Sequence, residues 1–356
     1  MLTLAAGLLV ASQLVACRSA FKDGQVGVSL ILKTLTNPYF VSMRNSAEAE
    51  AKKVNVKLSI AAGTADGDTQ TQINAIDTAI ARGDKGILIT SNGNAVNAAL
   101  RQAEDFGLFV IALDTPTIPA STVDITYATD NEQAGKLVGQ YAAAKLGGKK
   151  AVIAMLDLYD DQVASVDIER DHGFLEGMGI DPGSKTQNAQ EAKTGTYKYP
   201  GGTGTYQIVC HRPTQGAIDG GRTGMEQCLS ANPNINLVYS INEPAGEGAY
   251  AALKAAGKTS QAIIMSIDGS CQGIHYVDTG ELDADAVQYP GKMAALGVSS
   301  IAKLARGGKK PTATSGKAFL DTGTALVAKK TPAKLKAKVQ PTKDALKRCW
   351  GAGSSG

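Results

Sequence analysis

The chain has 356 residues, which is too long for one ordinary core and predicts two domains, each able to bury a sizeable interior. The net charge is +3, with 19% charged and 43% hydrophobic residues, and this balance argues against the clustered basic face that nucleic-acid binding requires. The basic stretch at residues 329–348 is expected to be a solvated surface, with contact to an acidic partner as the alternative. The three histidines show no metal-ligand spacing, so we expect no metal site.

The amino-terminal residues 1–16 carry no charge and are typical of the apolar core of an export signal. The segment Leu14-Val15-Ala16-Cys17 resembles a bacterial lipobox, which would make residues 1–23 a leader and would place a lipid anchor on Cys17. Neither Lys nor Arg precedes the apolar run, so an apolar helix of the fold is the alternative. No later apolar stretch reaches the ~20 residues that span a bilayer.

Four further cysteines fit an exported protein that forms disulfides. They allow three pairings. Proximity in the sequence favours Cys210 with Cys228, and elimination leaves Cys271 with Cys349.

Apolar runs that end on a polar residue recur along the chain and predict buried parallel strands. They are residues 26–33, 86–92, 108–114, 151–157, 237–242 and 263–268. In open α/β sheets the ligand lies outside the carboxyl ends of the strands. Carboxylates such as Asp114, Asp157 and Asp268 at these ends therefore indicate a ligand site, because an unpaired buried carboxylate is costly in a core.

Helical patterns alternate with the apolar runs. Asn37-Pro38 predicts a helix start with Asn as the N-cap, and this helix should continue to about Lys53. A second helix should begin at Asp68 and end at Gly83, and a third covers residues 246–256. The alternation restarts near Ala151, which predicts two similar Rossmann-like α/β lobes with parallel sheets.

The expected lobes are discontinuous in sequence. The amino-terminal lobe should comprise residues 24–129 and 290–320, and the carboxy-terminal lobe residues 130–289 and 321–350, so that three segments join them as a hinge. Residues 194–205 are dense in Gly and Thr without periodicity, and we expect a surface loop insertion there.

Several catalytic signatures are missing from the sequence. Gly257-Lys258-Thr259 follows a helical pattern rather than a strand, so it is not a phosphate-binding loop. No G-x-S-x-G elbow occurs, and no G-x-G-x-x-G follows the first strand. An enzyme that uses Asp157 and Asp268 as an acid/base pair remains an alternative.

Five motifs in order resemble the ribose-type periplasmic sugar-binding proteins, the receptors of ABC sugar importers. They are Thr36-Asn37-Pro38-Tyr39-Phe40, residues 110–114, Asn242-Glu243-Pro244, Ser266-Ile267-Asp268-Gly269 and residues 286–290, and the similarity covers residues 26–350. The stretches at 156–158, 242–245 and 349–351 most resemble the fructose-importer binding proteins.

The resemblance implies a set of first-lobe contacts with a sugar. Asn37 and Tyr39 and Phe40 match the family's Asn-Pro-aromatic-aromatic segment, in which the rings would face the C–H surface of the sugar, with core packing as the alternative role. Asp114 matches a strand-end aspartate that accepts hydroxyl hydrogen bonds. Thr115 stands where ribose binders have Arg, and Lys33 stands where they have Ser.

The second-lobe contacts follow in the same way. Arg170 matches the family's arginine four residues before Phe174, and its alternative role is a surface ion pair with Glu169 or Asp171. Asn242 and Asp268 match strand-end residues, and Gln288 matches a residue at both hinge and pocket. Asp157 and Glu243, each near a strand end of the second lobe, would contact the ligand or brace Arg170.

The resemblance thus implies a periplasmic or extracellular receptor, monomeric and without a cofactor, that is not an enzyme. It would bind a monosaccharide, with fructose favoured, and deliver it to the permease subunits of an ABC transporter through hinge closure. The alternatives are another pentose, a polyol or a small signalling sugar as ligand, and a sugar-acting enzyme. A sugar-responsive transcription regulator would need an amino-terminal helix-turn-helix, and residues 1–24 are too short and too apolar for one.

Overall fold

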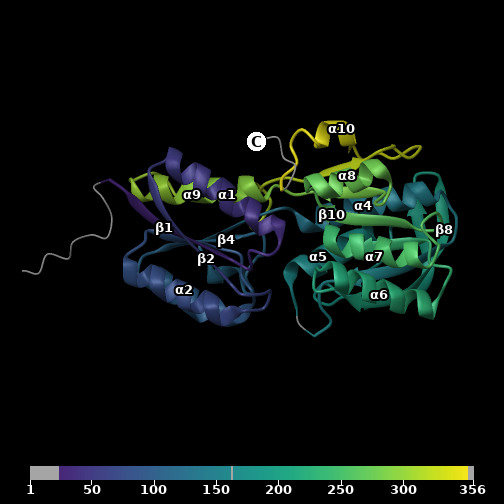
Figure 1. Ribbon diagram of the computed structural model, residues 1–356, viewed down its shortest axis with the longest axis horizontal. Coiled ribbons are helices and arrows are strands. Elements are labelled where there is room, and N and C mark those ends of the chain that lie inside the picture. The colour runs from purple at the N-terminus through teal and green to yellow at the C-terminus, as the bar shows by residue number, and fades with distance from the viewer. Residues whose placement is uncertain (1–23, 162, 352–356) are drawn as a thin grey trace, which may run out of the picture.

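The computed structural model describes residues 24–161 and 163–351, which form two α/β lobes side by side (Figure 1). The sheet of the first lobe is parallel throughout. Its strands lie in the order β12 (Leu320–Asp321), β5 (Ile125–Ala128), β4 (Phe109–Leu113), β3 (Gly86–Ile89), β1 (Val26–Leu32) and β2 (Val56–Ala62).

Helices cover both faces of this first sheet. One face packs against α1 (Pro38–Lys53) and α9 (Pro290–Ala305), as Met43 and Val298 show by their full burial between helix and sheet. The other face packs against α2 (Thr69–Arg82) and α3 (Asn97–Asp105). Two short 3₁₀ turns, Asn94–Val96 and Ala120–Thr122, follow β3 and β4.

The second sheet has eight strands, most of them parallel. Their order is β14 (Val339–Gln340), β13 (Ala325–Ala328), β11 (Ala284–Val287), β10 (Ile263–Asp268), β9 (Leu237–Ser240), β6 (Ala151–Asp157), β8 (Gly202–Pro213) and β7 (Thr194–Tyr199). The antiparallel neighbours are β11 with β13 and β7 with β8. Five helices flank the sheet and α10 (Thr342–Ala345) lies in the tail; the five are α4 (Asn131–Leu146), α5 (Ser165–Gly177), α6 (Ile218–Ala231), α7 (Glu243–Ala255) and α8 (Cys271–Thr279).

This architecture confirms the predicted fold class of two α/β lobes with parallel sheets. The chain passes between the lobes three times, after β5, after β11 and after β12. The helix signals were also accurate: the Asn37 side chain accepts a hydrogen bond from the Tyr39 amide at the start of α1, and Gly83 ends α2 with a φ of 76°.

The segment at residues 194–205 is not the surface loop that we expected. It forms β7, a two-residue turn and the start of β8, an antiparallel hairpin at the edge of the second sheet. Tyr197 and Tyr206 point into the core of this lobe, and their burial decides the structure despite the many Gly and Thr residues between them.

Both favoured disulfides are present. Cys210–Cys228 joins β8 to α6, and Cys271–Cys349 ties the carboxy-terminal tail to the start of α8. The leader and the lipid site at Cys17 lie outside the described residues. Within residues 24–161 and 163–351, no helix combines the length and the apolarity needed to cross a bilayer.

Close packing of α4 on α5 sets the position of Arg170. A Cβ atom on Gly135 would lie 2.2 Å from the Arg170 carbonyl oxygen, and one on Gly173 would lie 2.1 Å from the Glu132 carbonyl oxygen. Because backbone occupies that space, glycine is required for the two helices to approach this closely.

Candidate functional site

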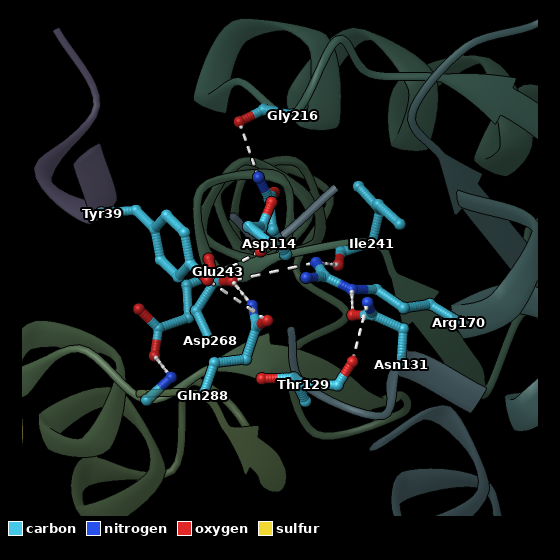
Figure 2. A network of polar contacts seen from close by, with 12 residues as sticks. Tyr39, Asp114, Thr129, Asn131, Arg170, Gly216, Ile241, Glu243, Asp268 and Gln288 are labelled. Carbon is cyan, nitrogen blue, oxygen red and sulfur yellow. Dashed lines mark hydrogen bonds and ion pairs between the residues drawn. The ribbon is translucent and has the colours of Figure 1, made fainter. Parts of the chain in front are cut away.

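A cavity lies between the lobes, at the carboxyl ends of the strands of both sheets, with ≈ 530 Å³ of empty space that includes the part open to solvent. Nine residues that the sequence predicted as ligand contacts line it: Lys33, Asn37, Tyr39, Phe40, Asp114, Arg170, Asn242, Asp268 and Gln288. Figure 2 shows the polar contacts among several of them.

Asp114 is the first-lobe carboxylate of this cavity. It follows β4 with a φ of 65°, a backbone region that Asp and Asn tolerate better than most residues, and its amide donates to the Tyr127 carbonyl oxygen at 2.8 Å. The Tyr39 hydroxyl donates to Asp114 Oδ1 at 2.7 Å, and the Thr115 hydroxyl donates to Oδ2 at 2.9 Å. Each carboxylate oxygen therefore keeps one further acceptor position for a ligand.

Tyr39 and Phe40 occupy the first turn of α1. Their rings meet edge to face at a centroid distance of 5.4 Å, and Tyr39 makes a second such contact, at 5.2 Å, with Trp350 of the tail. Both residues belong to the first-lobe core and also line the cavity. Core packing and a ligand-facing position are thus not exclusive here.

Arg170 is the cation of the second-lobe wall and is buried. Its Nε donates to Asn131 Oδ1 at 2.8 Å, and its Nη1 donates to the Ile241 carbonyl oxygen at 3.0 Å (Figure 2). Nη1 also lies 3.8 Å from Asp268 Oδ1, which makes the cavity carboxylate its ion-pair partner instead of Glu169 or Asp171. These contacts fix the plane of the guanidinium group before any ligand arrives.

Gln288 connects the two lobes at the point where the chain crosses between them. Its Nε2 donates to Asp268 Oδ1 at 2.9 Å, and its Oε1 lies 3.4 Å from the Tyr39 hydroxyl. The Trp350 indole nitrogen donates to the carbonyl oxygens of Asp268 and Gln288, at 3.3 and 3.1 Å. A change in the angle between the lobes would therefore alter contacts in the cavity itself.

Burial dominates the electrostatics of the second-lobe wall. It raises the pKa of Asp268 to about 7, although Arg170 and the Gln288 amide favour the charged form and limit the rise. Burial tends to lower the pKa of Arg170, but the carboxylates of Asp268 and Asp114 raise it, so the guanidinium stays charged. Burial also raises the pKa of Glu243, whose Oε1 accepts hydrogen bonds from the amides of Gly269 and Ser270 rather than bracing Arg170.

The two asparagines of the site are helix caps. Asn37 Oδ1 caps α1, and Asn242 Oδ1 caps α7 by accepting a hydrogen bond from the Ala245 amide at 3.0 Å. The Asn242 Nδ2 donates to the Gly216 carbonyl oxygen. The caps orient both amide groups at the cavity edge.

Two predicted contacts are not brought to the cavity. Of the described residues, Thr115 and Asp157 are not among those that line it, so their direct contact with a ligand stays a prediction. The Thr115 hydroxyl instead holds the Asp114 carboxylate through a hydrogen bond. Asp157 ends β6 but turns to the side of the sheet that carries His211, whose Nδ1 lies 2.7 Å from its Oδ2.

The sequence reasoning missed three polar lining residues and one glycine that lie in loops: Asp66, Tyr159, Gln215 and Gly216. Burial raises the pKa of Asp66, and nearby Lys33 opposes the rise. No strand-end pattern marks Asp66 or Gln215, because the strands before them, β2 and β8, end on Ala62 and Pro213; Tyr159 lies beyond Asp157, the polar end of β6. Only the general rule that such loops surround the site could have indicated them.

The assembled groups suit a small polyhydroxylated ligand. Carboxylates and a fixed guanidinium accept from and donate to hydroxyl groups, while the rings of Tyr39 and Phe40 supply apolar surface.

Comparison with known proteins agrees with this geometry. A family model described as the periplasmic binding protein domain matches residues 28–310. The ribose import binding protein RbsB of Escherichia coli (strain K12) is 28% identical over 305 residues, which cover 85% of this chain and 93% of that protein. The D-allose-binding periplasmic protein of the same organism is 25% identical, over 82% of this chain and 88% of that protein.

Solved structures share the fold. A galactofuranose binding protein superposes with a TM-score of 0.72 at 23% identity, covering 90% of this chain and 97% of that one. A periplasmic solute binding protein of an ABC transporter from Actinobacillus succinogenes 130z, with bound D-allose, gives a TM-score of 0.71 at 23% identity over 85% and 98% of the two chains. The ribose and allose proteins of Escherichia coli are named as binding proteins, which supports a receptor over an enzyme. The chain belongs to the periplasmic binding protein domain family.

Proposed function

We propose that this protein is an extracytoplasmic receptor that binds one monosaccharide between its lobes and delivers it to an ABC transporter. One observation carries the proposal: Asp114 from the first lobe and Arg170 with Asp268 from the second face the same cavity. Each lobe presents only part of the polar surface of this cavity, so a sugar that fills it would contact both lobes. The relatives named for ribose and allose support the sugar class.

The identity of the sugar is the finer part of the proposal. The resemblance to fructose-importer proteins favours D-fructose, whereas the named relatives favour D-ribose and D-allose as alternatives. Thr115 stands where ribose binders have Arg, and its hydroxyl donates a hydrogen bond to Asp114. This first-lobe wall therefore lacks a guanidinium that ribose binders offer, and its preference should differ from theirs.

Hinge closure would couple binding to transport. The three crossings between the lobes form the hinge, and the Ser165 hydroxyl of α5 donates across the cleft to the Pro116 carbonyl oxygen at 3.3 Å. A ligand shifts such an equilibrium only through its differential affinity for the closed form. Only in that form could one sugar donate to Asp114 and accept from Arg170 at the same time.

The partners follow from this role. The closed protein would dock on the permease subunits of the transporter as a monomer, outside the cytoplasm. Attachment to the membrane would depend on lipid at Cys17.

A titration with a panel of sugars tests the proposal. Calorimetry with D-fructose, D-ribose, D-allose and myo-inositol should show one saturable site for at least one of them, without turnover of the sugar. D-fructose should bind most tightly; a stronger response to an aldopentose would reject the fructose assignment and keep the receptor. Chemical conversion of any panel member would instead favour a sugar-acting enzyme.

A further inference from the structure

A second group of acidic residues surrounds His211 inside the second lobe, outside the cavity just described. Asp157 ends β6, Asp171 lies in α5, Glu191 precedes β7, and His211 belongs to β8. The three carboxyl side chains are buried, and the imidazole is nearly so. In the described part of the chain, none of these four residues is among those that line the cavity between the lobes.

Both ring nitrogens of His211 meet carboxylates. Nε2 lies 3.0 Å from Glu191 Oε1, which Lys193 also contacts at 3.2 Å. Nδ1 lies 2.7 Å from Asp157 Oδ2 and 4.0 Å from Asp171 Oδ2. A carboxylate on one imidazole nitrogen is the usual partner of a histidine that binds a metal through its other nitrogen, because it fixes the tautomer and raises the basicity of the ligand atom.

Several oxygens in this cluster have no partner. Asp171 is completely buried, and neither of its carboxylate oxygens has a hydrogen-bond partner in the described part of the chain; the same holds for Asp157 Oδ1 and Glu191 Oε2. Native proteins rarely leave buried carboxylate oxygens unsatisfied. Asp171 faces Asp157 and the Nδ1 of His211, and a cation bound between these groups would satisfy its oxygens.

We propose that Asp157, Asp171 and His211 coordinate a divalent transition-metal cation of the Zn²⁺ or Mn²⁺ class, with Glu191 holding the far nitrogen of the imidazole. One ligand atom from each of the three lies within 4.8 Å of the others. A mixed set of imidazole nitrogen and carboxylate oxygen suits these ions better than it suits Ca²⁺ or Mg²⁺, which prefer oxygen ligands throughout.

The cation would have a route of entry and room for water ligands. A separate cavity beside the cluster is lined by Asp157, Asp167 and His211, together with loop residues 186–190. The three ligands come from one helix and two strands, so their spacing along the sequence resembles no metal motif. For this reason the sequence alone gave no indication of the site.

A metal-free network is the competing explanation. Burial lowers the pKa of His211, but hydrogen bonds to Asp157 and Glu191 outweigh it and raise the pKa to about 10, so without metal the ring is an imidazolium that bridges these two carboxylates. That arrangement still leaves both carboxylate oxygens of Asp171 without a hydrogen bond. The two explanations differ in whether a cation binds when it is offered.

Calorimetry on the full chain after treatment with a chelator decides between them. Zn²⁺, Mn²⁺, Ca²⁺ and Mg²⁺ are titrated separately into the wild type, Asp171→Asn, His211→Gln and the control His275→Gln, which removes an exposed histidine on α8. Zn²⁺ or Mn²⁺ should bind at one site per chain and raise the melting temperature. Affinity should fall at least about tenfold in Asp171→Asn and His211→Gln and stay unchanged in the control.

Asp171→Asn keeps the proposal testable if His211→Gln fails to fold, because it preserves side-chain shape and removes only a charge. Absence of saturable binding in the wild type would overturn the proposal. Equal affinity in wild type and Asp171→Asn would overturn it as well, since the ion would then sit on surface groups. Tighter binding of Ca²⁺ than of Zn²⁺ and Mn²⁺ would refute His211 as a ligand.

Discussion

The substitution Asp114→Asn tests the first-lobe wall without disturbing the backbone. Asn, like Asp, tolerates the φ of 65° at this position, so the change avoids the strain that Ala would add. The amide oxygen can still accept the hydrogen bond from Tyr39, and the amide nitrogen can donate to the Thr115 hydroxyl. Folding should therefore be preserved.

The cost to sugar binding can be worked out from the acceptor positions. The carboxylate leaves one position on each oxygen for a sugar hydroxyl, whereas the amide leaves one in total, and that one is uncharged. Losing one charge-assisted hydrogen bond and weakening another costs about 2–4 kcal/mol, which is a loss of roughly 30- to 900-fold in affinity.

Calorimetry with the tightest sugar of the panel measures this loss, and thermal unfolding in the absence of sugar checks the fold. Asp124→Asn is the matched control, because Asp124 precedes β5 at the opposite end of the strands and contacts Lys310. Affinity within threefold of the wild type for Asp114→Asn would refute the assignment of Asp114 as a ligand contact.

Three further predictions concern the second lobe and the tail. Arg170→Lys keeps the charge but loses the planar fork, so sugar affinity should fall about 10- to 150-fold by calorimetry, while Arg222→Lys, at an exposed pair, should change nothing. Sugar affinity should rise with pH and level off above about 7, because ionised Asp268 is the better acceptor. Calorimetry at several pH values from about 5.5 to about 8.5 measures this, and an affinity that stays constant over the range would contradict it. Trp350, the sole tryptophan, contacts Tyr39 across the lobes, so sugar should change its fluorescence emission, and an unchanged spectrum at saturation would argue against closure.

Ionisation of Asp268 should strengthen sugar binding but lower the stability of the folded chain. Its pKa of about 7 in the folded chain exceeds the unfolded value of about 3.9, since burial disfavours the charge. Its contribution to stability is therefore complete below about pH 4 and is lost as the pH rises through 7. The chain without sugar should lose stability over the range in which sugar affinity grows.

Much of the fold could be predicted because local signals and burial agree. The Asn37 cap and the Gly83 terminus place two helices to within a residue, and the apolar runs ending at Asp157 and Asp268 match their strands. The hairpin at residues 194–213 was missed because Tyr197 and Tyr206 supply its core contacts from widely spaced positions among Gly and Thr.

The site could be predicted as far as strand ends and motifs determine it. Asp114 and Asp268 follow from the ends of β4 and β10, but the direction of a strand-end side chain does not; Asp157 at the end of β6 contacts His211 and does not line the cavity. Asp66 and Tyr159 reach the cavity from loops whose path depends on tertiary packing. Contacts that arise when separate elements converge, such as Arg170 with the Ile241 carbonyl oxygen, leave no local trace in the sequence.

A crystal structure with the tightest sugar of the panel tests the central claim most directly. The account predicts one sugar molecule in the cavity, with its hydroxyls on Asp114 of the first lobe and on Arg170 and Asp268 of the second. A sugar held by one lobe alone, or bound elsewhere on the surface, would contradict it.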